Sequence, residues 1–213
     1  MDISRIVIFS GGRLGDWALR LIQPDDFLIG ADRGALFLVS NGYQPDLALG
    51  DFDSVTEEEL AAIRAASKET LDFDPVEKDF TDTELAWKIA MDKKPGQLLL
   101  IGGLGTRFDH TLANVHLLRQ TAEHNTDAWI MDEHNRIRLV AGRACLPGSD
   151  FTYVSLLPLT ATVTGITLEG FQYPLTDATL EIGQSLGISN KLQADAGYVS
   201  IREGLLLLIE SRD

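Results

Sequence analysis

The sequence predicts an α/β fold, with an N-terminal domain built on a parallel sheet and a small antiparallel β domain after it. Through about residue 140, short apolar runs alternate with segments that carry helical start signals, which is typical of a parallel sheet covered by helices. From Cys145 onward, β-branched and aromatic residues fill short runs separated by Gly, Pro and Asn, with little helical periodicity. We therefore expect one domain over residues 1–141 and a second over residues 142–213.

The composition is that of a globular protein with a sizeable core. The chain has 213 residues, of which 45% are hydrophobic and 23% are charged, and this excludes long disordered stretches. The second domain, with roughly 70 residues, has a marginal core of its own. We expect it to pack on the first domain or on a second subunit.

The charge balance restricts the partners. The sequence has 32 acidic and 18 basic side chains, a formal net charge of −14, so its field repels nucleic acids and anionic membranes and attracts cations. The longest apolar stretches, Gln97–Ile101 and Leu205–Ile209, are far shorter than the ~20 residues of a membrane helix. We expect neither a nucleic acid nor a membrane as a partner.

Cysteine usage favours the cytoplasm. Cys145 is the single cysteine of the sequence, so no intramolecular disulfide can form. No group of Cys and His has the spacing of a structural zinc site.

Five apolar runs predict the strands of the first domain. They are Ile6–Phe9, Phe27–Ile29, Leu47–Leu49, Leu98–Ile101 and Ala128–Met131. Two segments between them begin with capping boxes, Thr56-x-x-Glu59 and Thr81-x-x-Glu84, and each opens a stretch rich in Ala and Leu. These two segments are expected helices.

The second domain is expected to contain only strands. Its runs are Phe151–Leu157, Thr160–Thr167, Ala178–Ile182, Gly197–Arg202 and Leu205–Ile209. Short alternating runs with turn residues between them favour an antiparallel β-sandwich.

Unusual polar and glycine-rich segments follow the predicted parallel strands. Ligands of an open parallel sheet bind beyond the carboxyl ends of its strands, so these loops are the expected site. The loops are Ser10–Gly12, Gly30–Gly34, Gly50–Ser54, Lys78–Asp82 and Gly102–His110.

Four carboxylates in these loops indicate a divalent cation. Asp51 and Asp53 lie two residues apart, so both side chains can point the same way in an extended segment, while Asp79 and Asp82 flank a helix start. Converging carboxylates repel one another unless a positive group lies among them, and hard oxygen ligands suit Mg²⁺ that is also bound by substrate phosphates. Each Asp taken alone could equally be a turn or cap residue.

The segment 102–110 has the features of a phosphate-binding loop. Its glycines let backbone N–H groups approach an anion, a helix start follows, and Arg107 adds a fork of donors. It is not a Walker A loop, because no Gly-Lys-Ser/Thr follows at the required spacing. The alternative is a βα loop with Asp109 as helix N-cap.

A competing pattern lies near the N-terminus. Ser10-x-Gly12-x-x-Gly15, with Asp32 about 20 residues further on, approximates the dinucleotide-binding fingerprint without its first glycine. It would indicate a nicotinamide- or flavin-dependent oxidoreductase, but it leaves the loops at 51–54, 78–82 and 102–110 without a role.

An ordered series of short motifs resembles the thiamine pyrophosphokinase family over nearly the whole chain. In the first domain the motifs are Asp32-x-Gly34-Ala35, Pro45-Asp46, Gly50-Asp51-Phe52-Asp53-Ser54, Lys78-Asp79-x-Thr81-Asp82-x-Glu84-Leu85-Ala86, Arg107-x-Asp109-His110 and Asn114. In the second they are Ser155–Leu159, Gly170–Leu175 and Gly187–Asn190. Arg33 and Thr106 depart from the family pattern, which often has glycine at both positions.

The resemblance implies a Rossmann-like first domain that binds Mg·ATP and a β-sandwich second domain that binds thiamine. It implies transfer of the pyrophosphoryl group of ATP to the hydroxyl of thiamine, which gives thiamine diphosphate and AMP. It also implies a homodimer in which thiamine lies between the first domain of one subunit and the second domain of the other.

The resemblance also assigns residues to roles. The positions implied for Mg²⁺ and catalysis are Asp51, Asp53, Asp79 and Asp82. Those implied for ATP are Asp32, Lys78, Thr81, Gly102, Gly103, Gly105, Arg107, Asp109 and His110, and those implied for thiamine are Ser189 and Asn190.

Two alternatives to this kinase activity stay open from the residues. One is the dinucleotide-dependent oxidoreductase. The other is a thiamine or nucleotide sensor without turnover, against which the intact set of four Asp residues argues.

Overall fold

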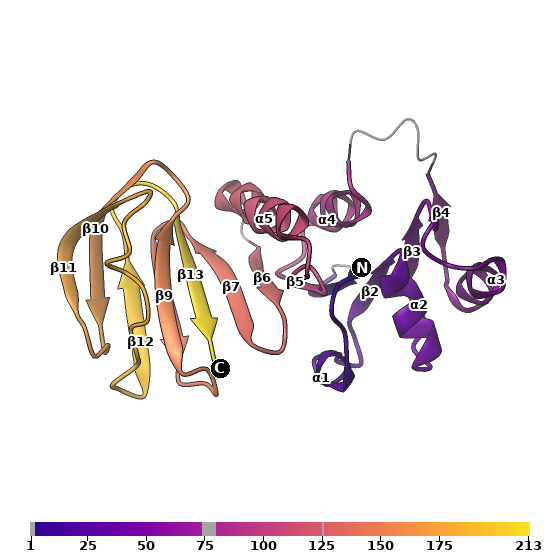
Figure 1. Cartoon of the computed structure of the whole chain (residues 1–213), viewed down its shortest axis with the longest axis horizontal. Helices are drawn as coiled ribbons and strands as arrows, with labels where there is room; N and C mark the ends of the chain where they lie inside the picture. The colour runs from indigo at the N-terminus through magenta and orange to yellow at the C-terminus, as the bar shows by residue number, and fades with distance from the viewer. Residues whose placement is uncertain (1–2, 74–79, 125) are drawn as a thin grey trace. The chain divides into compact units, whose positions relative to one another are not determined.

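The computed structural model describes residues 3–73, 80–124 and 126–213, and their fold is mixed α/β, with a large, mostly parallel sheet and a separate antiparallel sheet (Figure 1). The chain forms two compact units. The first unit comprises Met1–Leu117 and His124–Glu133, and the second comprises Leu118–Glu123 and His134–Asp213. The division falls before residue 134, because the strand that follows pairs within the second unit; the functional domains 1–141 and 142–213 stay a prediction.

The first unit is built on six parallel strands. They are β1 (Arg5–Phe9), β2 (Phe27–Ala31), β3 (Leu47–Gly50), β4 (Thr70–Asp72), β5 (Gln97–Ile101) and β6 (Asp127–Met131), in the spatial order β4-β3-β2-β1-β5-β6. The five strands predicted from apolar runs are confirmed. Sequence analysis missed β4, because three residues with a single apolar side chain, Leu71, make no run.

Helices cover both faces of these parallel strands. They are α1 (Asp16–Leu19), α2 (Arg33–Ser40), α3 (Glu57–Ala66), α4 (Asp82–Asp92) and α5 (Phe108–Leu117). Figure 1 shows α4 and α5 on one side of the strands and α1 and α2 on the other. With both faces covered, the whole of β1 is buried, which explains why its residues Ile6–Phe9 form a continuous apolar run.

The predicted helix starts are confirmed. At α3 the Thr56 hydroxyl accepts from the Glu59 N–H, and the Glu59 carboxylate accepts from the Thr56 N–H at 2.8 Å, so the capping box is complete. At α4 the Thr81 hydroxyl accepts from the Glu84 N–H at 3.2 Å. These caps satisfy N–H groups that have no partner within the helix.

The second unit contains two antiparallel groups of strands and the 3₁₀ segment η1 (Leu118–Glu123). One group has the order β7-β13-β9, with β7 (Asn135–Val140), β13 (Leu206–Ser211) and β9 (Tyr153–Pro158). The other is the separate sheet in the order β11-β10-β12-β8, with β11 (Leu175–Glu181), β10 (Thr162–Glu169), β12 (Ala196–Ser200) and β8 (Arg143–Pro147). The predicted antiparallel β character of this region is confirmed.

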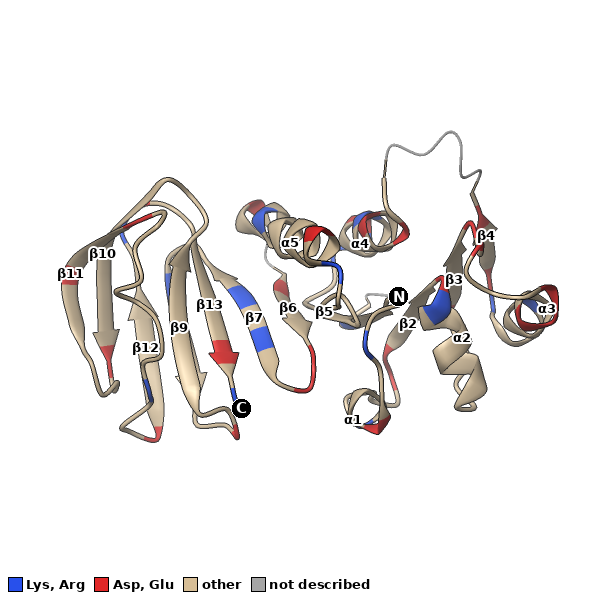
Figure 2. Cartoon of the chain, in the orientation of Figure 1, with Lys and Arg blue, Asp and Glu red and all other residues tan. Residues whose placement is uncertain are grey.

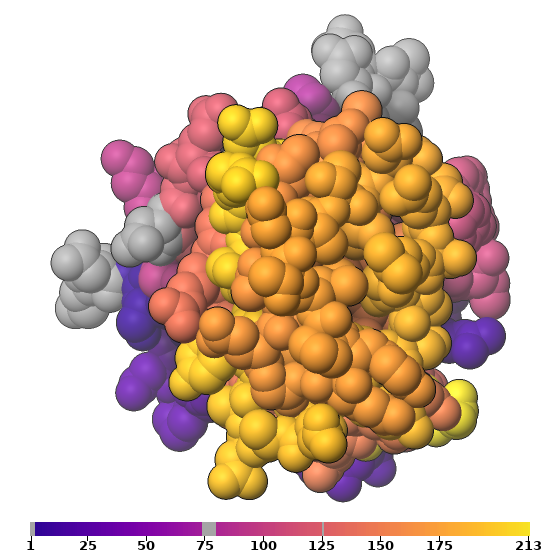
Figure 3. All heavy atoms as spheres, turned by 90° about the vertical axis from the view of Figure 1, so that its left-hand side faces the viewer, coloured from indigo at the N-terminus to yellow at the C-terminus, as the bar shows by residue number. Residues whose placement is uncertain are grey.

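Both groups of strands in the second unit contribute to one hydrophobic core. Leu156 and Leu208 come from the three-stranded group, whereas Val163, Leu180 and Val199 come from the four-stranded sheet, and all five are at most 2% exposed. In Figure 3 the surface that faces the viewer consists mostly of residues of the second unit, coloured orange to yellow.

Charges are distributed unevenly over the elements (Figure 2). In the first unit α3, α4 and β4 carry acidic side chains, whereas β7 of the second unit carries Arg136 and Arg138. Among the described residues, no helix is long and apolar enough to cross a membrane.

Candidate functional site

The candidate site lies where the strand order of the first unit reverses. Strands β1 and β5 are parallel neighbours, but the chain continues from β1 toward β2 on one side and from β5 toward β6 on the other. The loops that follow such strands part and leave a crevice at the carboxyl edge of the sheet. Here the two loops approach closely, because the Gly12 N–H donates to the Gly102 carbonyl oxygen at 3.0 Å.

A pocket of about 430 Å³, called here the larger pocket, opens at this edge. It is lined by residues from the loops after β1, β2, β3 and β5 and from the start of α4. The expectation that five loops share one edge of the sheet is therefore confirmed for their described residues.

Most of the residues that sequence analysis placed around ATP line the larger pocket. These are Asp32, Thr81, Gly102, Gly103, Gly105, Arg107 and His110, together with the expected metal ligand Asp82. Asp109 is not among the lining residues. Lys78 and Asp79 lie outside the described residues, and Ser189 and Asn190 belong to the second unit.

Three carboxylates come together next to the larger pocket. Each of Asp32, Asp51 and Asp53 offers an oxygen that lies within 4.8 Å of the others. The register of the sheet produces this cluster, because Ala31 of β2 pairs with Leu49 of β3 and the Asp32 N–H donates to the Leu49 carbonyl oxygen at 2.9 Å. Asp32, which the sequence assigned to ATP alone, is thus a member of the group that could hold a divalent cation.

The backbone at Asp32 is held in an unfavourable conformation. Its φ of 54° and ψ of −121° lie outside the regions that a side chain with a Cβ normally adopts, at a cost of about 1–3 kcal/mol. Gly50 faces it across the strand pair with a φ of 149°, and a Cβ at Gly50 would lie 3.2 Å from Asp32 Oδ1. Strain of this kind persists where the surrounding fold imposes it, and such positions concentrate at functional sites.

The Asp32 carboxylate is only partly satisfied by the protein. Oδ2 accepts a hydrogen bond from the Ser54 hydroxyl at 2.9 Å, whereas Oδ1 is buried and has no hydrogen-bond partner among the described residues. Burial raises the pKa of this carboxyl above its ordinary value, the Ser54 hydroxyl lowers it, and the charges of Asp82, Asp51 and Asp53 raise it. A buried acceptor among like charges is stabilised by a bound cation.

The donor set of the acidic cluster suits Mg²⁺. Carboxylate oxygens are hard ligands, and Mg²⁺ is usually bound by one or two carboxylates, substrate phosphates and water. The unpartnered Oδ1 of Asp32 supplies one such ligand, and the neighbouring pocket provides room for phosphates.

Arg107, which lines the larger pocket, forms an exposed ion pair with Asp109. Arg107 Nε and Nη2 donate to the two carboxylate oxygens at 3.2 and 2.6 Å. This bidentate contact lowers the pKa of Asp109 to about 2. In this structure Asp109 therefore orients the guanidinium that lines the pocket.

Several polar groups that shape the pocket had no structural role assigned to them from the sequence. The Ser10 and Thr83 hydroxyls are 2.6 Å apart and join the end of β1 to the first turn of α4. Asn114, buried on α5, donates through Nδ2 to the Gly103 carbonyl oxygen at 2.7 Å and so fixes the glycine loop. Asn114 was identified as one of the family motifs. Ser10 and Thr83 could not be identified as a contact from the sequence, because a single Ser or Thr carries no distinguishing signal.

In the second unit, Asn190 has a structural role in the segment expected to contact thiamine. Its Oδ1 accepts from the Tyr173 N–H at 3.0 Å, and its Nδ2 donates to the Tyr173 carbonyl oxygen at 2.7 Å. Ser189, which is exposed, has a φ of 59°, and its N–H donates to the Ser155 hydroxyl at 3.0 Å. Asn190 thus ties two loops together, and the role of both residues in thiamine binding stays a prediction.

Two family models match the chain, one in each half. Residues 18–130 match "Thiamin pyrophosphokinase, catalytic domain", and residues 145–206 match "Thiamin pyrophosphokinase, vitamin B1 binding domain".

Individual relatives extend these matches over most of the chain. A thiamine pyrophosphokinase of Bacillus subtilis is 35% identical over 192 residues, which cover 87% of each chain. A crystal structure of thiamine pyrophosphokinase from Bacillus subtilis superposes with a TM-score of 0.91 at 32% identity, covering 98% of this chain and 99% of that one. The structure from Geobacillus thermodenitrificans gives a TM-score of 0.87 at 33% identity, with 98% of each chain covered.

Proposed function

The chain belongs to the thiamine pyrophosphokinase family, and we propose that the larger pocket with its acidic cluster is the Mg·ATP site of this activity. The chain is a thiamine diphosphokinase, an enzyme of thiamine metabolism that transfers the pyrophosphoryl group of ATP to thiamine. The products are thiamine diphosphate and AMP.

The reaction has a simple bond balance. The hydroxyl oxygen of thiamine forms a bond to the β-phosphorus of ATP, and the bond between that phosphorus and the oxygen bridging to the α-phosphorus breaks. AMP leaves with the bridging oxygen, and the hydroxyl proton is released. Transfers of this type depend mainly on positioning and on stabilising charge on the phosphates.

The observation that carries the proposal is the acidic cluster beside a pocket lined by glycines and Arg107. Asp32, Asp51 and Asp53 would hold Mg²⁺, and Asp82, which lines the pocket, would join them. Asp79 keeps its proposed place in this set, although it lies outside the described residues. When bound, Mg²⁺ neutralises phosphate charge and acts as a Lewis acid, an effect of several kcal/mol in comparable sites.

The remaining lining residues would bind the phosphates. Gly102, Gly103 and Gly105 let the backbone approach an anion closely, and the Asn114 side chain holds their loop in place. Arg107 offers a guanidinium whose planar donors fit phosphate oxygens. The other proposed contacts to ATP are Thr81, His110 and Lys78, and Asp109 would orient Arg107.

We place thiamine binding in the second unit, at Ser189 and Asn190. The match of residues 145–206 to a vitamin B1 binding domain supports this assignment. Because the Asn190 amide holds the Tyr173 backbone, Asn190 would act mainly by shaping the segment, whereas the exposed Ser189 would contact the substrate.

A homodimer would complete the site. Phe108 and Leu112, one turn apart on α5, are 74% and 44% exposed, and Leu186 and Ile188 in the second unit are 65% and 43% exposed. Apolar side chains exposed in this way are typical of interfaces. A molecular mass of twice 23.4 kDa in sedimentation supports the dimer, and a monomer mass in the presence of ATP and thiamine would contradict it.

We also propose a fold type for each unit and a location in the cell. The parallel strands with a reversal beside β1 favour a Rossmann-like first unit, and the shared core of the two antiparallel groups favours a β-sandwich for the second. The lone Cys145 favours a cytoplasmic location.

Phosphorus NMR of the purified protein with ATP, thiamine and Mg²⁺ tests the function. We expect AMP and thiamine diphosphate to appear together and to require the divalent cation. Asp51→Asn and Asp82→Asn should each lose far more turnover than stability, whereas Asp92→Asn, an exposed control at the end of α4, should retain both. ADP with thiamine monophosphate, or no product, would contradict the proposal.

A further inference from the structure

Ser155 of β9 contacts the segment in which we place thiamine binding, and we propose that it is a positioning residue for Ser189. Its hydroxyl oxygen accepts a hydrogen bond from the Ser189 N–H at 3.0 Å. The inference rests on the proposed function, because it concerns how the protein holds the residue that would contact thiamine.

Ser189 has a backbone conformation that few side chains adopt. Its φ of 59° lies in the left-handed region, which favours glycine because a Cβ is crowded there. A serine persists in this conformation where its surroundings impose it, and such positions concentrate at functional sites. The residue is exposed, so its hydroxyl is accessible to a ligand.

The chain on either side of Ser189 is attached to β9. After it, Asn190 and Val154 exchange two backbone hydrogen bonds, of 2.9 and 2.8 Å. Before it, the Leu156 N–H donates to the Gly187 carbonyl oxygen at 2.8 Å. The hydroxyl contact from β9 lies between these two attachments and fixes the orientation of the peptide N–H that enters the strained residue.

Burial makes the Ser155 hydroxyl an effective acceptor. Ser155 is 8% exposed, and its neighbours Val154 and Leu156 belong to the hydrophobic core of the second unit. Side chains alternate along a strand, so Ser155 points to the face of β9 opposite to these two. In that place the hydroxyl has little access to water and gives the Ser189 N–H a partner that water does not readily replace.

Loss of the Ser155 hydroxyl would remove this partner and let Ser189 return to an ordinary backbone conformation. The Ser189 hydroxyl would then leave the place from which it contacts thiamine under the proposed function. The substitution should therefore weaken thiamine binding, whereas the proposed Mg·ATP site belongs to the first unit and should be unaffected.

Calorimetry with Ser155→Ala tests the positioning role. We expect the Kd for thiamine to rise by about fivefold to tenfold, as for the loss of one hydrogen bond, while the Kd for Mg·ATP changes by less than about twofold. In steady-state kinetics the KM for thiamine should rise with the Kd, and kcat should stay within about twofold.

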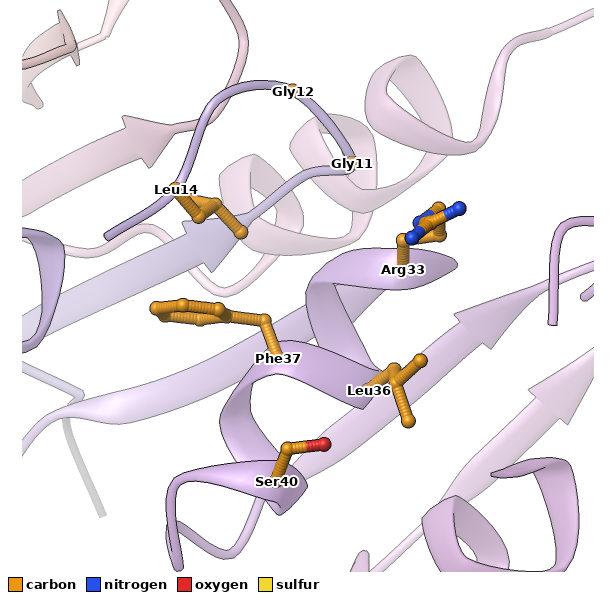
Figure 4. A pocket seen from close by; sticks show the side chains of 7 residues that line it. All are labelled: Gly11, Gly12, Leu14, Arg33, Leu36, Phe37 and Ser40. Carbon is orange, nitrogen blue, oxygen red and sulfur yellow. The ribbon is translucent and has the colours of Figure 1, made fainter. Parts of the chain in front are cut away.

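Two further variants accompany this measurement. Ser155→Thr keeps the hydroxyl and should bring the Kd for thiamine back to within about twofold of the unaltered protein. Ser40→Ala is the matched control, because it removes an exposed hydroxyl on α2 of the first unit (Figure 4), and it should leave the Kd for thiamine unchanged.

A double-mutant cycle separates positioning from a general loss of structure. Ser189→Gly removes the hydroxyl but adopts a positive φ without strain, so it should weaken thiamine binding while the protein keeps its thermal stability. In that background Ser155→Ala should change the Kd for thiamine by less than about twofold, because the side chain that it positions is gone. An equal loss in both backgrounds, or an unchanged Kd in Ser155→Ala alone, would overturn the positioning role.

The positioning role and the proposed function can fail separately. If Ser155→Ala does not fold, Ser155→Cys carries the same prediction, because a thiol has a similar shape and is a weak acceptor. If the unaltered protein forms thiamine diphosphate and the Ser155 variant binds thiamine equally well, the positioning role is wrong and the proposed function stands. If the unaltered protein neither binds thiamine nor forms product, the proposed function itself fails.

Discussion

Two carboxylates, the half-buried Asp32 in the first unit and the buried Glu210 in the second, differ sharply in their hydrogen-bond partners. Glu210, 1% exposed, accepts from Arg136 Nε at 2.8 Å, from Arg136 Nη2 at 2.6 Å and from the Ser149 hydroxyl at 3.0 Å. Asp32 accepts from the Ser54 hydroxyl alone, keeps a buried oxygen without a hydrogen-bond partner among the described residues, and faces like charges.

We interpret this contrast as the difference between a carboxylate that stabilises the fold and one that, under the proposed function, binds a ligand. A buried charge without a partner costs free energy, so a fold retains it only where something else binds it. Glu210 is bound by its own chain. Asp32 Oδ1 is a buried oxygen without such a partner among the described residues, and we propose it as a ligand for a cation.

We expect the substitution of Asp32 to change turnover more than any other variant proposed below. Asp32→Asn removes a proposed metal ligand and also removes like-charge repulsion, so turnover should fall by at least about 100-fold while the protein keeps or gains stability. Steady-state kinetics and urea denaturation on the same preparation measure the two effects. Parallel losses of turnover and stability would place Asp32 with Glu210 as a structural group.

A variant of Glu210 tests whether this carboxylate stabilises the fold without acting on the reaction. Glu210→Gln weakens charge-assisted bonds to Arg136 and should lower the free energy of unfolding by about 1–3 kcal/mol, with turnover per folded molecule unchanged. Denaturant titration measures the loss, and Glu203→Gln, at an exposed position, is the control. A large loss of turnover in the still folded variant would show that the second unit's ion pair acts on the reaction.

Alanine substitutions at two glycines test the close approach of the loops after β1 and β5. Gly12→Ala would place a Cβ 2.2 Å from the Gly102 carbonyl oxygen, so the loops at the strand reversal must part, at a cost of about 1–3 kcal/mol. Nucleotide binding should weaken with it. Gly142→Ala meets no atom within 4 Å and should change neither thermal stability nor nucleotide affinity; equal effects of the two variants would remove the role given to this close approach.

Two exposed ion pairs of similar geometry allow a comparison in which we expect only a modest change in the KM for ATP. Arg107 donates to Asp109 at 2.6 Å, and Arg202 donates to Asp177 at 2.8 Å. Neither Arg107→Met nor Arg202→Met should change stability measurably, because exposed pairs are screened by water. Only Arg107→Met should raise the KM for ATP, by about tenfold.

The same Arg107 variant has a spectroscopic readout. Without the guanidinium, the pKa of the Asp109 carboxyl should rise from about 2 toward its ordinary value, which carboxyl NMR titration measures. A KM for ATP that rises equally in the Arg202 variant would assign the effect to net charge and not to the pocket.

Much of the fold was predictable because its signals are local. Continuous apolar runs identified five parallel strands, and Thr56 and Thr81 marked two helix starts, since burial and capping depend on neighbouring residues. The strand β4 was missed because it is short and only Leu71 in it is apolar.

The candidate site was predictable as a set of loops and motifs but not as contacts. The order of the glycine and aspartate motifs indicated which loops meet, because loops after parallel strands share an edge. The hydroxyl contact between Ser10 and Thr83 joins residues 73 positions apart, and no local pattern announces it.

The sequence alone was enough to predict the α/β class, the antiparallel character of the second half, the acidic charge and which loops line one pocket at the edge of the parallel sheet. Which carboxylates form a cluster follows from the tertiary structure. The parallel register of β2 and β3 places Asp32 beside Gly50 and within reach of Asp51 and Asp53, and burial then deprives Asp32 Oδ1 of water. Periodicity and capping act over a few residues, whereas strand register and burial are properties of the assembled sheet.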